Sequence, residues 1–235
     1  MTDTTLTPLD PGNQPDETTM AELSPAERRR QRVRDMILNA AEKVFAEEGE
    51  TGLSIRRLAD EIDYSPAAIY KYFGSKDDLV EELKSAFFAR LMSKVEATYA
   101  AHEEYLDRCR ACIQTYIYTA LERPHHYTAA FSGVQEHDAG GDEARWDEFV
   151  ESTSGQAYIM FRDLIDQGRQ QGVFPEIDTA VATKSAWASM HGLVMLMIHL
   201  PHFPGSFPDS EAIDRETFIA RHADLLVRGL SAKKM

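Results

Sequence analysis

Three side chains that can bind phosphate stand next to one another in the stretch "SPAAIYKYFGSK", residues 65–76. Tyr70 and Tyr72 carry hydroxyl groups, and Lys71 between them carries an ammonium group. Such groups donate hydrogen bonds to phosphate oxygens, and these contacts fix the position of a protein on a nucleic acid without reading its sequence. The spacing of these residues therefore predicts non-covalent binding of a nucleic-acid backbone.

The residues before this group are small enough to let the chain approach the bases. Ser65–Pro66 combines a hydroxyl N-cap with a proline at the first helical position. Ala67 and Ala68 follow, and small side chains permit close approach to base edges and methyl contacts with thymine. We expect this short helix to face the major groove, with Ile69 and Phe73 turned toward the protein core.

A short helix and a turn precede this segment and position it. Ser54 should cap the first short helix, whose inner face is Leu58, Ala59 and Ile62, and Gly74 should end the second. Two short helices joined by a turn and supported by the helix before them form a helix-turn-helix. In this motif the second helix usually enters the major groove of DNA.

A strongly basic segment begins the supporting helix. The stretch "RRRQRVR", residues 28–34, holds five arginines in seven positions. It is either the solvated start of a helix or an arm that reaches phosphates or the minor groove, and its place beside a helix-turn-helix favours the arm. Arg56 and Lys76 should lie near the same DNA backbone, Lys76 at a helix N-terminus where a bound phosphate is favourable. The candidate contacts from the basic segment are Arg28, Arg29 and Arg30.

Charge is distributed unevenly along the chain. The 235 residues carry a net charge of −14, with six acids and no bases in residues 1–27 and twenty-five acids and fifteen bases in residues 77–235. Residues 28–76 hold ten bases and eight acids, so the only positive segment contains the helix-turn-helix. Local charge rather than total charge decides contact with phosphate. Residues 1–24, rich in Thr, Asp and Pro, should form a disordered acidic tail.

The cysteines and histidines do not favour catalysis or metal binding. Cys109 and Cys112 form a C-x-x-C pair, but they fall within a predicted helix with no strand before them, so buried and inert thiols are the favoured interpretation. His191 and His199 lie two helical turns apart, about 12 Å, which is too far for one ion. We therefore expect no metal, no cofactor and no enzymatic activity.

The rest of the chain also predicts helices, since no segment alternates as a strand does. We expect helices at about residues 75–101, 103–123, 124–131, 142–171, 178–200 and from 214, with a polar loop at 132–143. The uncharged stretch 185–208 has an apolar part of about 15 residues, whereas a bilayer span needs about 20. We expect a soluble, cytoplasmic protein.

These elements predict an all-α fold with a helix-turn-helix domain at residues 25–75 and a helical ligand-binding and dimerisation domain at 76–235. Aromatic and methionine side chains between helices can line a cavity for a small, largely apolar ligand, although packing in an ordinary core is the alternative for each. The candidates for this cavity are Tyr116, Phe131, Met160, Trp187, His191 and Met195. The last helix has one apolar face, and its candidates for a homodimer interface are Phe218, His222, Leu225 and Leu226.

The stretches "ILNAAEKVFAEEG" and "LSIRRLADEIDYSPAAIYKYFGSKDDLV" resemble the TetR family of transcription regulators over about residues 30–85. By position, the resemblance implies that Ser54, Tyr70 and Lys76 contact phosphate. Tyr72 stands where the family often has histidine. The turn "IDYS" lacks the family's usual glycine, so Asp63 should adopt a left-handed conformation, which Asp tolerates better than most residues. A shorter stretch, "WASMHGLVML", resembles the Trp-x3-His-Gly type of TetR C-terminal domain.

The resemblance implies a homodimeric repressor that binds a palindromic operator in double-stranded DNA and is released from it by a small-molecule effector. Base contacts would fall to Arg56, Lys71 and the basic arm, because Ala67 and Ala68 have little hydrogen-bonding reach. Two alternatives remain open: a constitutive DNA-binding protein without an effector, and a thiol redox enzyme that uses the C-x-x-C pair.

Overall fold

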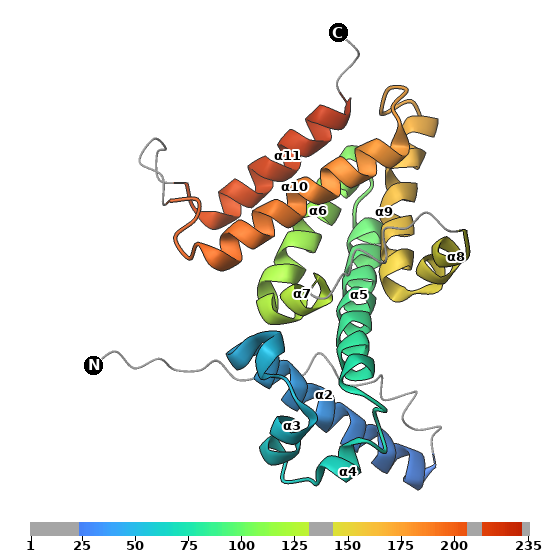
Figure 1. The fold of residues 1–235 in the computed structure, drawn as a ribbon. Coiled ribbons are helices and arrows are strands. Elements are labelled where there is room, and N and C mark those ends of the chain that lie inside the picture. The colour runs from blue at the N-terminus through green and yellow to red at the C-terminus, as the bar shows by residue number, and fades with distance from the viewer. Residues whose placement is uncertain (1–23, 132–142, 206–212, 232–235) are drawn as a thin grey trace.

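The computed structural model describes residues 24–131, 143–205 and 213–231, and within these ranges it consists of helices and connecting turns, with no strand (Figure 1). The helices are α2 (Pro25–Gly52), α3 (Ile55–Glu61), α4 (Pro66–Ile69), α5 (Lys76–Ala101), α6 (Tyr105–Glu122), α7 (Pro124–Phe131), α8 (Glu143–Glu151), α9 (Thr153–Gln170), α10 (Thr179–His199) and α11 (Arg215–Ser231). The predicted all-α fold is confirmed. The predicted disordered tail and the predicted polar loop lie outside the described residues, apart from the last residue of each.

Helix α2 begins where the sequence provides a cap. The N–H of Ser24 donates to Oε2 of Glu27 at 2.8 Å, and the N–H of Glu27 donates to Oγ of Ser24 at 3.3 Å, which is a capping box. Near the other end, Gly49 has a φ of 71°, a left-handed conformation that costs glycine little. The helix therefore kinks at Gly49, and a last helical turn runs on to Gly52.

Serine hydroxyls start the next three helices, as predicted for Ser54 and Ser65. The Oγ atoms of Ser54, Ser65 and Ser75 each accept a hydrogen bond from the backbone N–H three residues further on, at 3.2, 3.2 and 3.0 Å. In the turn between α3 and α4, Asp63 has a φ of 55°, the left-handed conformation predicted for it. These caps and this turn set where α4 begins and which of its residues point outward.

The N-terminal helices share one hydrophobic core with parts of two later helices. Its members include Ile37 of α2, Leu58 of α3, Ile69 of α4, Leu79 of α5 and Ala129 of α7. Because α5 and α7 also belong to the C-terminal helices, the helix-turn-helix is joined to the rest of the protein by packed side chains and not only by the chain itself.

A second, larger core holds the C-terminal helices together. Its most deeply buried members include Phe87, Ile117, Tyr127, Ile165 and Ile219. Helices α10 and α11 both pack on α6 and cross the end of the molecule that is furthest from α2–α4 (Figure 1). Helix α5 runs from the helix-turn-helix into this core and so connects the two ends of the molecule.

The single helix predicted for residues 142–171 is wrong, because the structure has two helices there. Oγ of Ser152 accepts from the N–H of Gly155 at 3.0 Å and donates to the carbonyl oxygen of Phe149 at 2.6 Å, which ends α8 and starts α9. Gly155 lies so close to α8 that a Cβ on it would be 1.8 Å from that carbonyl oxygen. The chain therefore turns sharply at this point, and α8 packs on α9.

Candidate nucleic-acid interface and ligand cavity

Helix α4 and the residues after it expose several of the side chains that were predicted to contact DNA, whereas Ala68 and Tyr72 are half-buried. Tyr70 is 54% exposed, and Lys71 and Ala67 are also exposed. Ile69 and Phe73 are buried in the N-terminal core, as predicted. Small and polar side chains thus form the outer surface of this segment, while its apolar side chains hold it in place.

A cluster around Arg34 holds α4 against α2 and α5. The guanidinium of Arg34 donates to the carbonyl oxygen of Tyr72 at 3.2 Å, lies 4.6 Å from the ring centroid of Phe73, and pairs with Glu82 at 2.9 Å. The guanidinium of Arg30 lies 5.9 Å from the ring centroid of Tyr72, which is half-buried. The positioning role of Arg34 was not predicted, because no local pattern pairs it with residues so far along the chain.

The basic segment is helical and does not form an extended arm. Residues 28–34 all lie in the first turns of α2, so they form the start of a helix, and their contact with phosphate or the minor groove stays a prediction. Arg29 and Arg30 are exposed and Arg28 is half-buried. The beginning of α2 and helix α4 lie at the same end of the molecule (Figure 1). The arginines therefore remain candidates for phosphate contact, but from a rigid helix.

Beside this surface, the start of α3 offers one exposed arginine. Arg56 is exposed, whereas the neighbouring Arg57 pairs with Glu48 at 2.9 Å and with Glu61 at 2.7 Å. Ser54 is exposed and its hydroxyl already caps α3. Of the two adjacent arginines, Arg56 is thus the one available to a nucleic acid.

Substitutions in this surface should weaken binding to all duplexes about equally. We expect Tyr70→Phe to lower affinity about threefold to tenfold, because it removes one hydroxyl contact to phosphate. Lys76→Ala should lower the slope of log affinity against log salt by about one unit per subunit. Titrations of a specific and a random duplex at several salt concentrations measure both effects. A change in sequence preference at unchanged affinity would contradict these roles.

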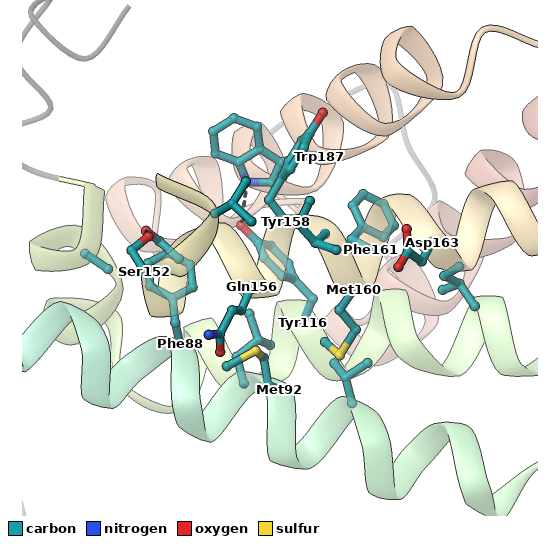
Figure 2. Close-up of a pocket in the computed structure, with 18 of the residues that line it drawn as sticks. Phe88, Met92, Tyr116, Ser152, Gln156, Tyr158, Met160, Phe161, Asp163 and Trp187 are labelled. Carbon is teal, nitrogen blue, oxygen red and sulfur yellow. Dashed lines mark hydrogen bonds between the residues drawn. The ribbon is translucent and has the colours of Figure 1, made fainter. Parts of the chain in front are cut away.

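A large cavity opens between α5–α7 and α8–α10, with a volume of about 1700 Å³. Figure 2 shows Phe88 and Met92 of α5, Tyr116 of α6, Met160 of α9 and Trp187 of α10 around it. Its wall is mainly apolar and aromatic, as small-molecule sites in proteins are. A drug-sized or larger apolar ligand would fit in this space.

Four of the six residues predicted to bind ligand lie in the wall of this cavity. These four are Tyr116, Phe131, Met160 and Trp187. The other two do not line it: Met195 packs against the C-terminal core, and His191 lies behind the wall. The helical spacing placed these two residues near the cavity but could not show which side of α10 faces it.

A chain of hydrogen bonds runs from the cavity wall into the protein. Nε1–H of Trp187 donates to the hydroxyl oxygen of Tyr116 at 3.2 Å, this hydroxyl lies 2.8 Å from that of Tyr127, and the Tyr127 hydroxyl lies 2.6 Å from Nδ1 of His191. Burial raises the pKa of Tyr116 to about 12 and lowers the pKa of His191 below its ordinary value. All four groups are therefore neutral at neutral pH.

The two thiols are buried in α6 and are poorly suited to redox chemistry. Burial raises the pKa of Cys109 to about 12 and that of Cys112 to about 11. The thiolate is the reactive form, and it is scarce at neutral pH when the pKa is this high. The structure therefore favours the interpretation of inert core thiols.

We expect both thiols to react at least roughly 100-fold more slowly with a disulfide reagent at pH 8 than the thiols of the urea-unfolded chain. The reason is that raised pKa values leave few thiolates and that the side chains are buried. The rate of colour release by an aromatic disulfide measures this. Fast labelling of the folded protein, or loss of DNA binding in a Cys109→Ser/Cys112→Ser variant with unchanged thermal stability, would revive the redox alternative.

Within the part of the chain that the structure describes, no three His, Cys, Asp or Glu side chains come together as a metal site. No helix of that part is long and apolar enough to cross a membrane.

Of the four residues predicted to form the dimer interface, one is exposed and three are half-buried. Leu225 of α11 is 69% exposed. Phe218 packs on Phe203 with ring centroids 5.4 Å apart, Nε2 of His222 lies 3.5 Å from the hydroxyl of Ser189, and Leu226 packs against the core of its own subunit. Leu196 of α10 and Leu200, the residue just after α10, are also exposed. Large apolar side chains therefore remain uncovered along α10 and α11 in the single chain.

Comparisons with known proteins place the chain in one family. Residues 37–83 match the model of bacterial regulatory proteins of the tetR family, and residues 109–219 match a tetracyclin repressor-like C-terminal domain. The chain is 30% identical over 208 residues to the HTH-type transcriptional repressor NicS of Pseudomonas putida, covering 85% of this chain and 92% of that protein. It is 24% identical over 162 residues to the HTH-type transcriptional repressor KstR2 of Mycobacterium tuberculosis, covering 67% and 79%.

Solved structures show the same fold. The TetR family transcriptional regulator PfmR of Thermus thermophilus superposes with a TM-score of 0.60 at 22% identity, covering 83% of this chain and 99% of that one. The ketosteroid transcriptional regulator KstR2 of Mycobacterium tuberculosis superposes with a TM-score of 0.59 at 19% identity, covering 85% and 95%. The chain belongs to the TetR family of transcriptional regulators. The matches do not assign its C-terminal domain to the Trp-x3-His-Gly type.

Proposed function

We propose that the protein is a homodimeric transcriptional repressor that leaves a palindromic operator when a small, largely apolar ligand occupies its cavity. The observation that carries this proposal is the position of α5. This helix begins at Lys76, a short turn after α4, which is the reading helix expected to enter the major groove. Further along, α5 contributes Phe88, Leu91, Met92 and Val95 to the cavity wall. One rigid element thus borders both the DNA-binding surface and the ligand site. The names of the relatives NicS and KstR2, both repressors, agree with the proposal.

The DNA-binding unit in this proposal is the helix-turn-helix of residues 25–75 with the start of α5. Tyr70, Lys71 and Lys76 would contact phosphates. Ala67 and Ala68 would approach the bases. The exposed arginines of α2 and α3 would add further phosphate contacts. Arg34 would act indirectly, by holding the end of α4 against α2 and α5.

Dimerisation in this proposal uses the uncovered faces of α10 and α11. Pairing Leu196, Leu200 and Leu225 with the same residues of a second copy would remove large apolar side chains from water. Obligate interfaces of this kind are largely apolar and bury more than about 2,000 Å². The two reading helices must then lie about 34–36 Å apart to enter successive major grooves on one face of DNA.

Ligand binding would act through α5 and α7. In α7, Tyr127 belongs to the hydrogen-bond chain behind the cavity wall, while Ala129 is buried in the N-terminal core. The guanidinium of Arg123, just before α7, donates to both carboxylate oxygens of Glu42 in α2, at 2.8 and 3.0 Å. A ligand that favours a different α5–α7 arrangement would change the spacing of the reading helices. A coupling of about 1–3 kcal/mol corresponds to a 5–150-fold change in DNA affinity.

Transcription in vitro tests the repressor role. A promoter is built around a palindrome selected by the protein from random duplexes, and transcript is measured with purified RNA polymerase as the protein is added. We expect transcription to fall as the palindrome fills and to be unaffected on a promoter with a scrambled site. Transcription that rises with the intact palindrome would make the protein an activator and contradict the proposal.

A further inference from the structure

Among the polar side chains in the cavity wall, the hydroxyl of Tyr116 is joined to a hydrogen-bond chain that runs into the protein. Tyr116 and Trp187 both line the cavity, and Figure 2 shows them joined by the hydrogen bond from Trp187 to Tyr116. The apolar side chains of Phe88, Met92 and Met160 lie around the same space. A polar atom of a ligand that reaches this apolar part of the wall would meet the Tyr116 hydroxyl.

The hydrogen-bond chain behind the wall decides whether the Tyr116 hydroxyl donates a hydrogen bond into the cavity or into the protein. When Nδ1 of His191 carries its proton, it donates to Tyr127, Tyr127 donates to Tyr116, and the hydroxyl hydrogen of Tyr116 is free for a ligand. In the other tautomer the direction reverses, and Tyr116 donates inward to Tyr127. Nε1–H of Trp187 also donates to the hydroxyl oxygen of Tyr116. When this oxygen accepts from both Trp187 and Tyr127, the Tyr116 hydrogen is left to donate, which favours a ligand oxygen that accepts a hydrogen bond.

The charges around the cavity favour a neutral ligand over an anion. The charged residues in the described part of its wall are Glu81, Lys84, Glu96, Glu148, Asp163 and Lys184. Four acids outnumber two lysines, and Nζ of Lys84 already lies 3.9 Å from a carboxylate oxygen of Glu81. The hydrogen-bond partners of Tyr116 itself, Trp187 and Tyr127, are neutral. A carboxylate at Tyr116 would be desolvated without a positive partner, which is costly.

We propose that the cavity binds a neutral, flat and largely apolar ligand through a carbonyl oxygen that accepts a hydrogen bond from Tyr116, whose hydroxyl is oriented by Trp187 and Tyr127. The aromatic walls contact the flat faces of the ligand, and the Tyr127–His191 pair supplies the tautomer that turns the Tyr116 hydroxyl hydrogen toward it. This inference deepens the proposed function, because it names the chemical class of the effector for the same cavity.

Binding of prodan, a neutral naphthyl ketone whose fluorescence and carbonyl stretching frequency respond to hydrogen bonding, tests this directly. We expect saturable binding to the full-length protein, with the carbonyl band at a hydrogen-bonded frequency. Tyr116→Phe should weaken binding about threefold to tenfold and shift that band toward its value in a dry apolar solvent. Tyr118→Phe, the same change on the same helix but outside the cavity wall, is the matched control and should change neither quantity.

Two further measurements keep the test decisive. Trp187→Phe removes, at a partly exposed position, the hydrogen bond that Trp187 donates to the Tyr116 hydroxyl, so it should also weaken prodan binding. It replaces Tyr116→Phe as the test if that variant fails to fold. Anilinonaphthalene sulfonate, an anionic aromatic probe, should bind more weakly than prodan. Equal prodan affinity and an unchanged carbonyl band in the folded Tyr116 and Tyr118 variants would overturn the inference, and so would tighter binding of the sulfonate.

DNA release is measured separately, in a shift assay with prodan present. A probe that binds through Tyr116 but leaves the DNA complex intact would contradict the effector role of the cavity while supporting the carbonyl site. If prodan binding did not depend on Tyr116, the carbonyl site would be contradicted, whether or not the DNA complex dissociated.

Discussion

Leu225→Glu is expected to give a folded monomer that loses operator binding by about 1,000-fold or more. Leu225 is 69% exposed, so a glutamate there costs the subunit's own core little. In a dimer that pairs α10 and α11 with their mates, the same glutamate would be buried without a partner, which costs several kcal/mol per charge. A single reading helix holds only a half-site, and its affinity should fall to the non-specific range.

Ala220→Glu is the matched control for this change. Ala220 is exposed on the same helix, five residues earlier and therefore about 140° around the helix axis from Leu225. We expect this variant to remain a dimer with normal DNA affinity. Sedimentation and shift assays on the same samples give both quantities. A Leu225→Glu protein that stays dimeric, or a folded monomer that still binds a full palindrome tightly, would show that another surface joins the subunits or that one subunit suffices.

Ala67→Glu is expected to remove specific DNA binding while leaving the fold and the dimer intact. Ala67 is exposed at the start of α4, so the substitution should change the free energy of unfolding by no more than about 0.5 kcal/mol. At the DNA surface a longer, negatively charged side chain would meet base edges and phosphates. A penalty of about 1–3 kcal/mol per reading helix, counted twice in a dimer, weakens binding at least roughly 30-fold.

Ala100→Glu is the matched control for Ala67→Glu. It makes the same change of charge and size at the end of α5 that is furthest from α4. Ala100 is exposed there, 24 residues along the helix from Lys76, or about 36 Å. We expect its operator affinity to stay within about twofold of the unmodified protein. If Ala67→Glu and Ala100→Glu bound the operator equally well, α4 would not be the element that enters the groove.

Much of the fold was predictable because short local sequence patterns mark where its helices begin and end. The hydroxyls of Ser54, Ser65 and Ser75 start three helices, and the left-handed conformation of Asp63 marks the turn between α3 and α4. A cap depends on a few neighbouring residues, so its effect can be read from the chain alone. The same local character explains why the outward and inward faces of α4 were predicted correctly.

The corner between α8 and α9 was not predictable in the same way. The periodicity of residues 142–171 continues without interruption, and Ser152 is not followed by a proline that would start a new helix. What makes the corner possible is Gly155, whose lack of a side chain lets α9 approach the carbonyl of Phe149. That requirement becomes visible only when the two helices are placed against each other.

Contacts between distant segments were the other source of error. The hydrogen-bond chain that joins Tyr116, Tyr127 and His191 links three helices. Arg34 contacts Tyr72 and Glu82, which lie 38 and 48 positions later in the chain. Spacing within one helix places His191 on a face but cannot show that Tyr127 stands between it and the cavity. Spacing therefore placed four of the six predicted residues in the cavity wall, but it could not show that His191 and Met195 lie outside it.

Selection of binding sites from a library of random duplexes tests the central claim, that two subunits read DNA together. The full-length protein is mixed with the library at physiological salt, bound duplexes are recovered over several rounds, and the enriched sequences are aligned. We expect an inverted repeat whose half-site centres lie about 34–36 Å apart. Enrichment of no common sequence, or of a single half-site without its inverted partner, would contradict the account.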